Sequence, residues 1–224
     1  MIWILLFLAT LVLVLGPTLW VKRVMAKHGR DRPDLPGTGG ELAEHLVARF
    51  ELPEVTVEKT DRGDHYDPES RTVRLSPSVH DGRSLTAVAV AAHEVGHALQ
   101  HGDGYAPLRQ RQRLVKLGFW IDRIGSAVLF ALSLFGAGLV SPRLLLLGAV
   151  AVVLMGLFRV AVHLITLPVE LDASFNRALP ILRRDGYLAG RDLDRANSVL
   201  KAAAWTYVAS ALMELLSLAR FLRR

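Results

Sequence analysis

Residues 93–97 read His-Glu-Val-Gly-His, and these side chains are of the types that bind and use a metal ion. The surrounding residues 84–101 are mainly small and aliphatic, and they predict a buried helix with Ser84 as its N-cap. Residues i and i+4 share a face of a helix, so His93 and His97 can converge on one zinc ion. The carboxylate of Glu94 can then take a proton from water beside that ion. The pattern favours hydrolysis of a peptide or other amide bond.

Gly96 stands in the interior of this predicted helix, where glycine is about 1 kcal/mol less favourable than alanine. Its presence predicts that another backbone segment or a substrate approaches the helix closely at this point. A structural interpretation of residues 93–97 is also open, with two histidines and a carboxylate on a helix surface and no metal ion. The helical context of the motif favours the metal site.

A third protein ligand is expected, because two histidines do not complete a catalytic zinc site. We choose Glu170, which follows Pro168 at the end of an apolar segment, where a carboxylate needs a specific reason to be present. His101 is the main alternative. It lies eight residues after His93, about 2.2 helical turns, and reaches the same ion only if the helix breaks after Leu99. Further alternatives are His163 and Asp172. If Glu170 has only a structural role, we expect it to pair with Arg177.

Five other polar residues are candidates for contacting substrate or for holding the ligands in place: His65, Tyr66, His163, Asp172 and Tyr207. His65 and Tyr66 could stabilise an oxyanion, although residues 63–68 have the composition of a turn. Tyr207 is explained equally well as an aromatic residue at the membrane interface. His163 lies seven residues before Glu170 and can share its helix face.

Apolar residues are concentrated in four segments, residues 1–21, 124–140, 144–167 and 202–222. About 20 apolar residues span a bilayer, so the first three are good candidates, and the fourth, which contains Glu214, is weaker. We expect residues 1–21 to be a retained anchor, because the basic residues follow the apolar run instead of preceding it. These basic residues place the next domain in the cytoplasm by the positive-inside rule. The chain is therefore expected to be a multi-pass protein of the inner (plasma) membrane.

The formal net charge of +6 does not indicate a nucleic-acid partner, since the basic residues gather mainly at the flanks of the apolar segments. The expected partners are the lipid bilayer and a peptide or membrane-protein substrate. The chain has no cysteine, which excludes disulfides and thiolate metal ligands.

The predicted fold class is an α-helical membrane protein with a small α+β, zincin-like head and three to four transmembrane helices. Thr38 and Glu41 have the spacing of a capping box, and residues 55–60 and 71–76 alternate as half-buried strands do. The predicted domains are an N-terminal transmembrane anchor (1–21), a catalytic head (22–123), a transmembrane hairpin (124–167), a helical segment supplying the third zinc ligand (168–201) and a C-terminal apolar helix, which we expect to span (202–224).

The chain resembles the bacterial membrane-bound neutral zinc metallopeptidases in four motifs along almost its whole length. These are Asp-His-Tyr-Asp-Pro, Val-Arg-Leu-Ser, Ala-Ala-His-Glu-Val-Gly-His-Ala-Leu-Gln-His and Leu-Pro-Val-Glu-Leu-Asp-Ala-Ser. The resemblance implies an integral membrane protease of the gluzincin kind with one Zn²⁺ per chain. It implies His93, His97 and Glu170 as ligands and Glu94 as general base. The related heat-shock and prenyl-protein membrane peptidases carry Asp four residues after the third ligand. Ser174 stands there in this chain, and Asp172 is the candidate to replace that aspartate.

Two alternative functions stay open from the sequence. One is a non-catalytic membrane scaffold, in which four ligands including His101 close a structural zinc site. The other is hydrolysis of an amide other than a peptide. For the peptidase, we also expect the strand at residues 71–76 to pair with an extended substrate.

Overall fold

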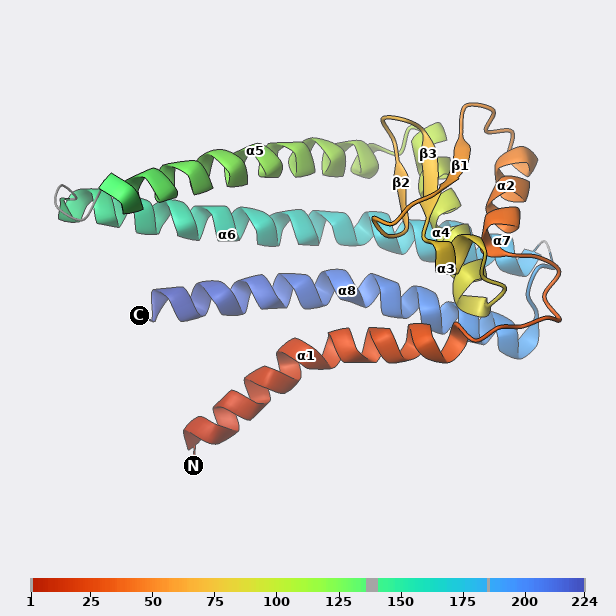
Figure 1. Ribbon diagram of the computed structural model, residues 1–224, viewed down its shortest axis with the longest axis horizontal. Helices are drawn as coiled ribbons and strands as arrows, with labels where there is room; N and C mark the ends of the chain where they lie inside the picture. The colour runs from red at the N-terminus through yellow and green to blue at the C-terminus, as the bar shows by residue number, and fades with distance from the viewer. Residues whose placement is uncertain (1, 136–140, 185, 224) are drawn as a thin grey trace.

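Four long helices extend in roughly one direction from a small head (Figure 1). They are α1 (Ile2–His28), α5 (Ala106–Phe135), α6 (Pro142–Leu171) and α8 (Gly190–Leu222). This computed structural model describes residues 2–135, 141–184 and 186–223. Both ends of the chain lie away from the head, and α1 is visibly bent (Figure 1). Pro17 lies inside α1, and a proline in a helix interior is a common cause of such bends.

Two helical stretches of the described chain are long and apolar enough to cross a bilayer, Arg143–Arg184 and Gly190–Leu222. They contain the expected spans at residues 144–167 and 202–222. The expected spans at residues 1–21 and 124–140 include residue 1 and residues 136–140, which lie outside the described residues. Three to four spans therefore stay a prediction.

Small residues allow the long helices to pack closely. A Cβ at Gly125 of α5 would lie 2.6 Å from the sulfur of Met155 on α6. On the other side of α6, a Cβ at Gly156 would lie 2.4 Å from Leu218 on α8. Helices that cross a membrane commonly associate through small residues in this way. α6 is thereby held between α5 and α8.

Arg159 on α6 connects the same three helices electrostatically. Its guanidinium lies 2.8 Å from Asp122 on α5 and 3.2 Å from Glu214 on α8. Charges among apolar helices are costly unless they are paired. The cluster therefore fixes how α5 and α8 sit against α6.

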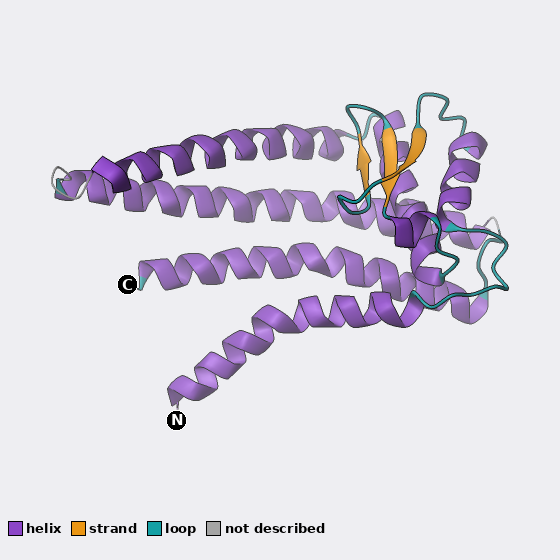
Figure 2. Ribbon diagram, viewed as in Figure 1, coloured by secondary structure: helices purple, strands orange, loops and turns teal. Residues whose placement is uncertain are grey.

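The head contains a three-stranded sheet in the order β1-β3-β2 (Figure 2). β1 (Thr56–Lys59) pairs in parallel with β3 (Thr72–Leu75), and β2 (His65–Asp67) pairs with β3 in the antiparallel direction. The expected strands at residues 55–60 and 71–76 are confirmed, while the turn composition at residues 63–68 conceals β2. The expectation that residues 71–76 pair with substrate is wrong, because β3 is central and both of its edges are already paired.

Three short helices complete the head: α2 (Gly39–Arg49), α3 (Pro77–His80) and α4 (Leu85–Gly102). The predicted capping box of α2 is present, with Thr38 and Glu41 hydrogen-bonded to each other's backbone N–H. Ser84 caps α4 as predicted, since its Oγ accepts a hydrogen bond from the N–H of Ala87. Most of α4 is buried, with alanine and valine on the sides that pack against α2 and the sheet.

The chain does not break at Pro168 but continues as helix into a π-helix, η1 (Asp172–Ala178), and then α7 (Leu179–Arg184). A π-helical turn widens the helix locally, and such turns are frequent at functional sites. η1 packs directly on α4. This contact brings the end of α6 to residues 93–97.

Candidate metal centre

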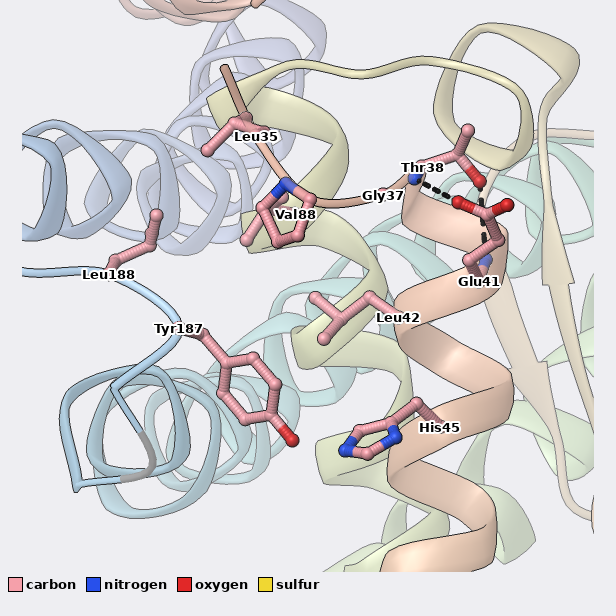
Figure 3. A pocket seen from close by; sticks show the side chains of 10 residues that line it. Leu35, Gly37, Thr38, Glu41, Leu42, His45, Val88, Tyr187 and Leu188 are labelled. Atoms are coloured by element: carbon pink, nitrogen blue, oxygen red, sulfur yellow. Dashed lines mark hydrogen bonds between the residues drawn. The ribbon is translucent and has the colours of Figure 1, made fainter. Parts of the chain in front are cut away.

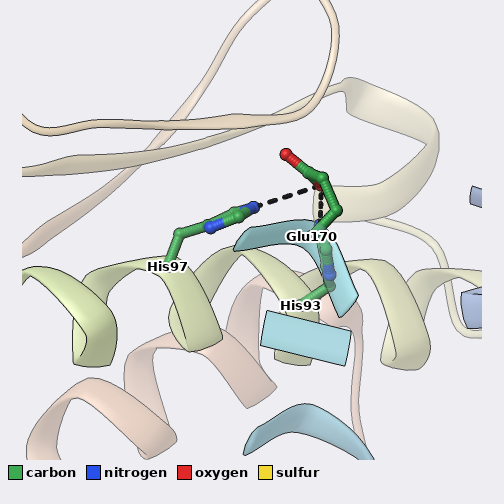
Figure 4. A group of neighbouring side chains, drawn as sticks. All are labelled: His93, His97 and Glu170. Carbon is green, nitrogen blue, oxygen red and sulfur yellow. Dashed lines mark hydrogen bonds and ion pairs between the residues drawn. The ribbon is translucent and has the colours of Figure 1, made fainter. Parts of the chain in front are cut away.

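His93, His97 and Glu170 converge in the interior of the head (Figure 4). One ligand atom from each lies within 4.8 Å of the others, and all three residues are buried. The Oε2 atom of Glu170 is 3.2 Å from His93 Nε2 and 3.5 Å from His97 Nε2. The two histidines come from one face of α4, as their spacing predicted, and the glutamate comes from the last turn of α6.

Gly96 makes this convergence sterically feasible. A Cβ at Gly96 would lie 2.8 Å from the carbonyl oxygen of Ala173, a backbone atom of η1. The expected close approach of another backbone segment is therefore confirmed. Any larger residue would push η1 and the adjoining Glu170 away from α4.

The ring orientation of His97 is fixed by Gln100, which is fully buried. The Nε2 amide of Gln100 donates hydrogen bonds to the carbonyl of Val169 and to Asp172 Oδ2, each at 2.8 Å. Since both amide hydrogens are used, Gln100 Oε1 is left as an acceptor, and it lies 2.9 Å from His97 Nδ1. His97 Nδ1 therefore carries the proton, and the lone pair of Nε2 points toward Glu170.

His93 has an equivalent contact on its other nitrogen. Its Nδ1 lies 3.0 Å from the hydroxyl of Ser174, which is fully buried. Ser174 is thus placed where it can orient His93. Asp172 contacts Gln100, which in turn contacts His97, and it forms an ion pair with Arg177. The alternative pairing of Glu170 with Arg177 does not occur, because Arg177 contacts Asp172 and Asp103 instead.

Glu94 follows the first histidine and is itself buried. Burial raises the pKa of its carboxyl to about 7. His93 and a hydrogen bond with the backbone of Tyr66 lower this pKa, whereas the nearby Glu170 raises it. A carboxyl of this kind can both accept and release a proton near neutral pH.

Two polar side chains approach Glu170 from the neighbouring long helices. Arg111 on α5 places a guanidinium nitrogen 3.4 Å from Glu170 Oε1. Tyr207 on α8 lies within electrostatic range of Glu170, Arg111 and Glu94. The site is thus enclosed by α4, α5, α6 and α8.

The other candidate residues lie farther from the three ligand atoms. His101 Nδ1 is 2.8 Å from the hydroxyl of Tyr66, and the two side chains form a hydrogen bond. Burial lowers the pKa of His101, so the neutral ring can accept this hydrogen bond. His65 contacts the carbonyl of Gly63 through its Nδ1. His163 is half-buried on α6, two helical turns before Glu170. These positions bring neither His101 nor His163 into the group of three.

Zinc fits the residues that are present. Two imidazole nitrogens and one carboxylate oxygen form a donor set that catalytic zinc sites use, leaving a coordination position free. In addition, Glu170 Oε1 is buried and has no hydrogen-bond partner among the described residues. Its ion pair with Arg111, at 3.4 Å, is too long for a good hydrogen bond, so a metal cation would further offset the cost of burying this carboxylate.

The sequence matches the family described as "Putative neutral zinc metallopeptidase" over residues 3–224. The chain belongs to this family. It is also similar to a curated protein of Bacillus subtilis (strain 168) named "Putative membrane protease YugP". The two are 40% identical over 225 residues, which cover 96% of this chain and 95% of that protein. No solved structure matches the chain.

Two residues at the site were not predicted from the sequence. Gln100 lies seven residues after His93 and three after His97, so helical spacing alone could have placed it on the same face of α4. Arg111 is 59 residues from Glu170 in the sequence, and no local pattern connects the two. Only the packing of α5 against α6 brings them together.

Proposed function

We propose that this protein is a membrane-bound zinc endopeptidase that hydrolyses peptide bonds. The observation that carries the proposal is the convergence of His93, His97 and Glu170, with the buried carboxyl of Glu94 beside them on α4. A structural zinc site has no use for Glu94 at that position, whereas hydrolysis needs a proton acceptor there. The family and the similarity to a curated membrane protease support the same reaction class.

A zinc ion held by His93, His97 and Glu170 supplies Lewis acidity, which polarises a carbonyl and makes water more acidic. Glu94 takes a proton from the attacking water, whose oxygen forms a bond to the carbonyl carbon. Glu94 then delivers this proton to the amine nitrogen as the C–N bond breaks. Gln100 and Ser174 hold the two imidazoles in orientation throughout.

The two candidate membrane spans support a site close to the bilayer. Glu170 follows the apolar part of α6, and Tyr207 lies on α8, so both spans contribute to the site. We propose a multi-pass protein of the plasma membrane with its head in the cytoplasm. Its substrates are then peptides or membrane-protein segments at the cytoplasmic surface.

The test compares the detergent-purified protein with its Glu94→Gln and His97→Ala variants. Zinc content and cleavage of an unstructured casein-type substrate are measured on each. We expect about one zinc in the parent and in Glu94→Gln, much less in His97→Ala, and cleavage by the parent alone. Because Glu94→Gln changes one atom of the side chain, it separates the chemistry from metal binding. Equal cleavage by the parent and Glu94→Gln contradicts the proposal, and zinc without cleavage in the parent favours a scaffold.

A further inference from the structure

A cavity of about 220 Å³ opens beside His97, between the end of β2 and the first turns of α5. Tyr66 lies on its sheet side, and Arg111 and Gln112 lie on its helix side. The cavity has the volume of about seven water molecules, which suits one side chain or a chain end. Since His97 forms part of its wall, a group bound in the cavity lies close to the candidate metal centre.

The wall contains one buried donor without a hydrogen-bond partner among the described residues and one arginine with a long ion-pair contact. The amide nitrogen Nε2 of Gln112 is buried and has no partner in the described part of the chain. The guanidinium of Arg111 is about a quarter exposed and approaches Glu170 Oε1 at 3.4 Å, too far for a good hydrogen bond. A buried donor without a partner costs about 1–3 kcal/mol, so a ligand that accepts from it is favoured.

The acidic groups of the same wall are already neutralised. Asp67 forms an ion pair with Arg74 at 2.6 Å and accepts a hydrogen bond from Ser70. Glu69 pairs with Lys116 on α5. These carboxylates therefore neither compete strongly for Arg111 nor repel an incoming anion.

The charge of the metal centre reinforces this preference. A divalent ion held by His93, His97 and Glu170 would leave a net positive charge there in the Glu94→Gln protein, and a smaller one where Glu94 is ionised. Arg111 adds a second positive charge at the mouth of the cavity. A carboxylate in the cavity meets both charges at short range in a partly buried site.

A second cavity of the head has a different lining. It measures about 360 Å³ and lies between α2, α4 and the loop before α8 (Figure 3). The carboxylate in its wall, Glu41, is held by the capping box of α2, and Tyr187 and His45 face each other across it (Figure 3). The described residues that line it include no arginine, lysine or candidate metal ligand. Of these two cavities, only the one beside His97 has basic side chains and a candidate metal ligand among the described residues that line it.

We propose that the cavity beside His97 binds a carboxylate of the peptide substrate through Arg111 and Gln112. The carboxylate is either an Asp or Glu side chain next to the scissile bond or the C-terminal carboxylate of the peptide. This inference rests on the proposed peptidase function and adds a substrate preference to it.

The test uses four peptides with one parent sequence. They carry Glu or Gln beside the cleaved bond, and each has either a free or an amidated C-terminus. Binding is measured by fluorescence anisotropy on the zinc-loaded Glu94→Gln protein, which does not depend on turnover. One good charge-assisted contact corresponds to about tenfold in affinity, so we expect the preferred carboxylate peptide to bind about tenfold more tightly than its amide counterpart. The pair that shows the difference identifies the source of the carboxylate.

Variants of the cavity are made in the same Glu94→Gln background. Arg111→Gln is expected to reduce the ratio of carboxylate to amide affinity to about one. Gln112→Met is expected to reduce this ratio by a smaller amount. Unlike Arg111, Gln112 makes no ion pair with Glu170, so this variant leaves that contact in place. Arg113→Gln, on the exposed side of α5, is the matched control and should keep the full ratio. Zinc content is measured on every variant.

Equal binding of all four peptides overturns the inference, and so does an unchanged ratio in Arg111→Gln. A uniform loss of affinity for every peptide in Arg111→Gln also overturns it, because Arg111 then acts on all substrates alike. The two proposals fail separately. A parent protein that binds carboxylate peptides selectively but cleaves none contradicts the peptidase function alone, whereas cleavage without preference contradicts the cavity alone.

Discussion

His97 Nδ1 donates a hydrogen bond across 2.9 Å to Gln100 Oε1, three residues later on the same helix. The same Gln100 side chain donates to the carbonyl of Val169 and to Asp172, on either side of Glu170. One buried amide therefore orients a histidine of α4 and attaches that helix to the segment that carries the third candidate ligand. The geometry of the candidate metal centre therefore depends on a residue that is not itself a ligand.

Replacing Gln100 by Leu should weaken zinc binding about 10- to 100-fold, the usual cost of losing a partner of a metal ligand. Zinc affinity is measured by competition with a chromophoric chelator. The double variant Gln100→Glu/Asp172→Asn reverses the hydrogen bond with residue 172 and keeps an acceptor for His97 Nδ1, but it loses the donor to the Val169 carbonyl, so it should recover only part of the affinity. If both proteins bind zinc equally poorly, Gln100 acts only through packing.

Replacing Ser174 by Ala should lower zinc affinity about tenfold, because the Nδ1 atom of His93 loses its partner inside the protein. Isothermal titration of zinc into the metal-free protein measures the effect. Ser198→Ala is the control, since that hydroxyl bonds to the carbonyl of Asp194 on the exposed side of α8. An unchanged affinity in Ser174→Ala assigns the orientation of His93 to other contacts.

Gly96→Ala should separate α4 from η1. An added Cβ meets the carbonyl oxygen of Ala173 at 2.8 Å, and neither helix backbone can yield easily. Overpacking of this kind costs about 1–3 kcal/mol, which exceeds the roughly 1 kcal/mol that alanine gains in helix propensity. We expect a lower thermal midpoint and weaker zinc binding.

The control for this substitution is Gly102→Ala in the last turn of α4. A Cβ there meets Leu52 at 3.5 Å, an ordinary contact. A rise in the thermal midpoint of Gly96→Ala similar to that of the control would show that helix propensity outweighs the contact with Ala173.

Arg159→Met should destabilise the protein in detergent, because Asp122 and Glu214 then lose the cation that both contact. Removing one member of a charge cluster is costly, while replacing all members by apolar residues is often neutral. The triple variant Asp122→Leu/Arg159→Met/Glu214→Leu should therefore be more stable than Arg159→Met alone. Thermal unfolding followed by tryptophan fluorescence measures both. The opposite order would mean that the carboxylates do not depend on Arg159.

Zinc should stabilise the folded protein. A ligand present at 100 times its dissociation constant contributes about 2.7 kcal/mol if it binds only the folded state. Metal-free protein, prepared with a chelator, is therefore expected to unfold at a lower temperature and to recover when zinc is restored. The His97→Ala variant is the control and should show little response to zinc. A similar shift in that variant would place the stabilising ion at another site.

The sequence by itself determined the local parts of this protein. The small and aliphatic composition of residues 84–101 and the N-cap Ser84 predicted α4, and the i, i+4 spacing predicted that His93 and His97 share its face. Thr38 and Glu41 predicted the start of α2, and Gly96 predicted a close contact. Each of these depends on residues a few positions apart, where helix geometry alone decides which side chains meet.

Only the tertiary structure decided which segments far apart in the sequence contact one another. Glu170 was chosen from the sequence by reasoning about a carboxylate near a membrane, but only η1 packing on α4 places it beside the histidines. β2 was concealed by turn-forming residues, because pairing with β3 overrides local composition. Arg111 carries no local pattern at all. Its place beside Glu170 follows from the packing of α5 against α6, which depends on the apolar and small residues of two whole helices.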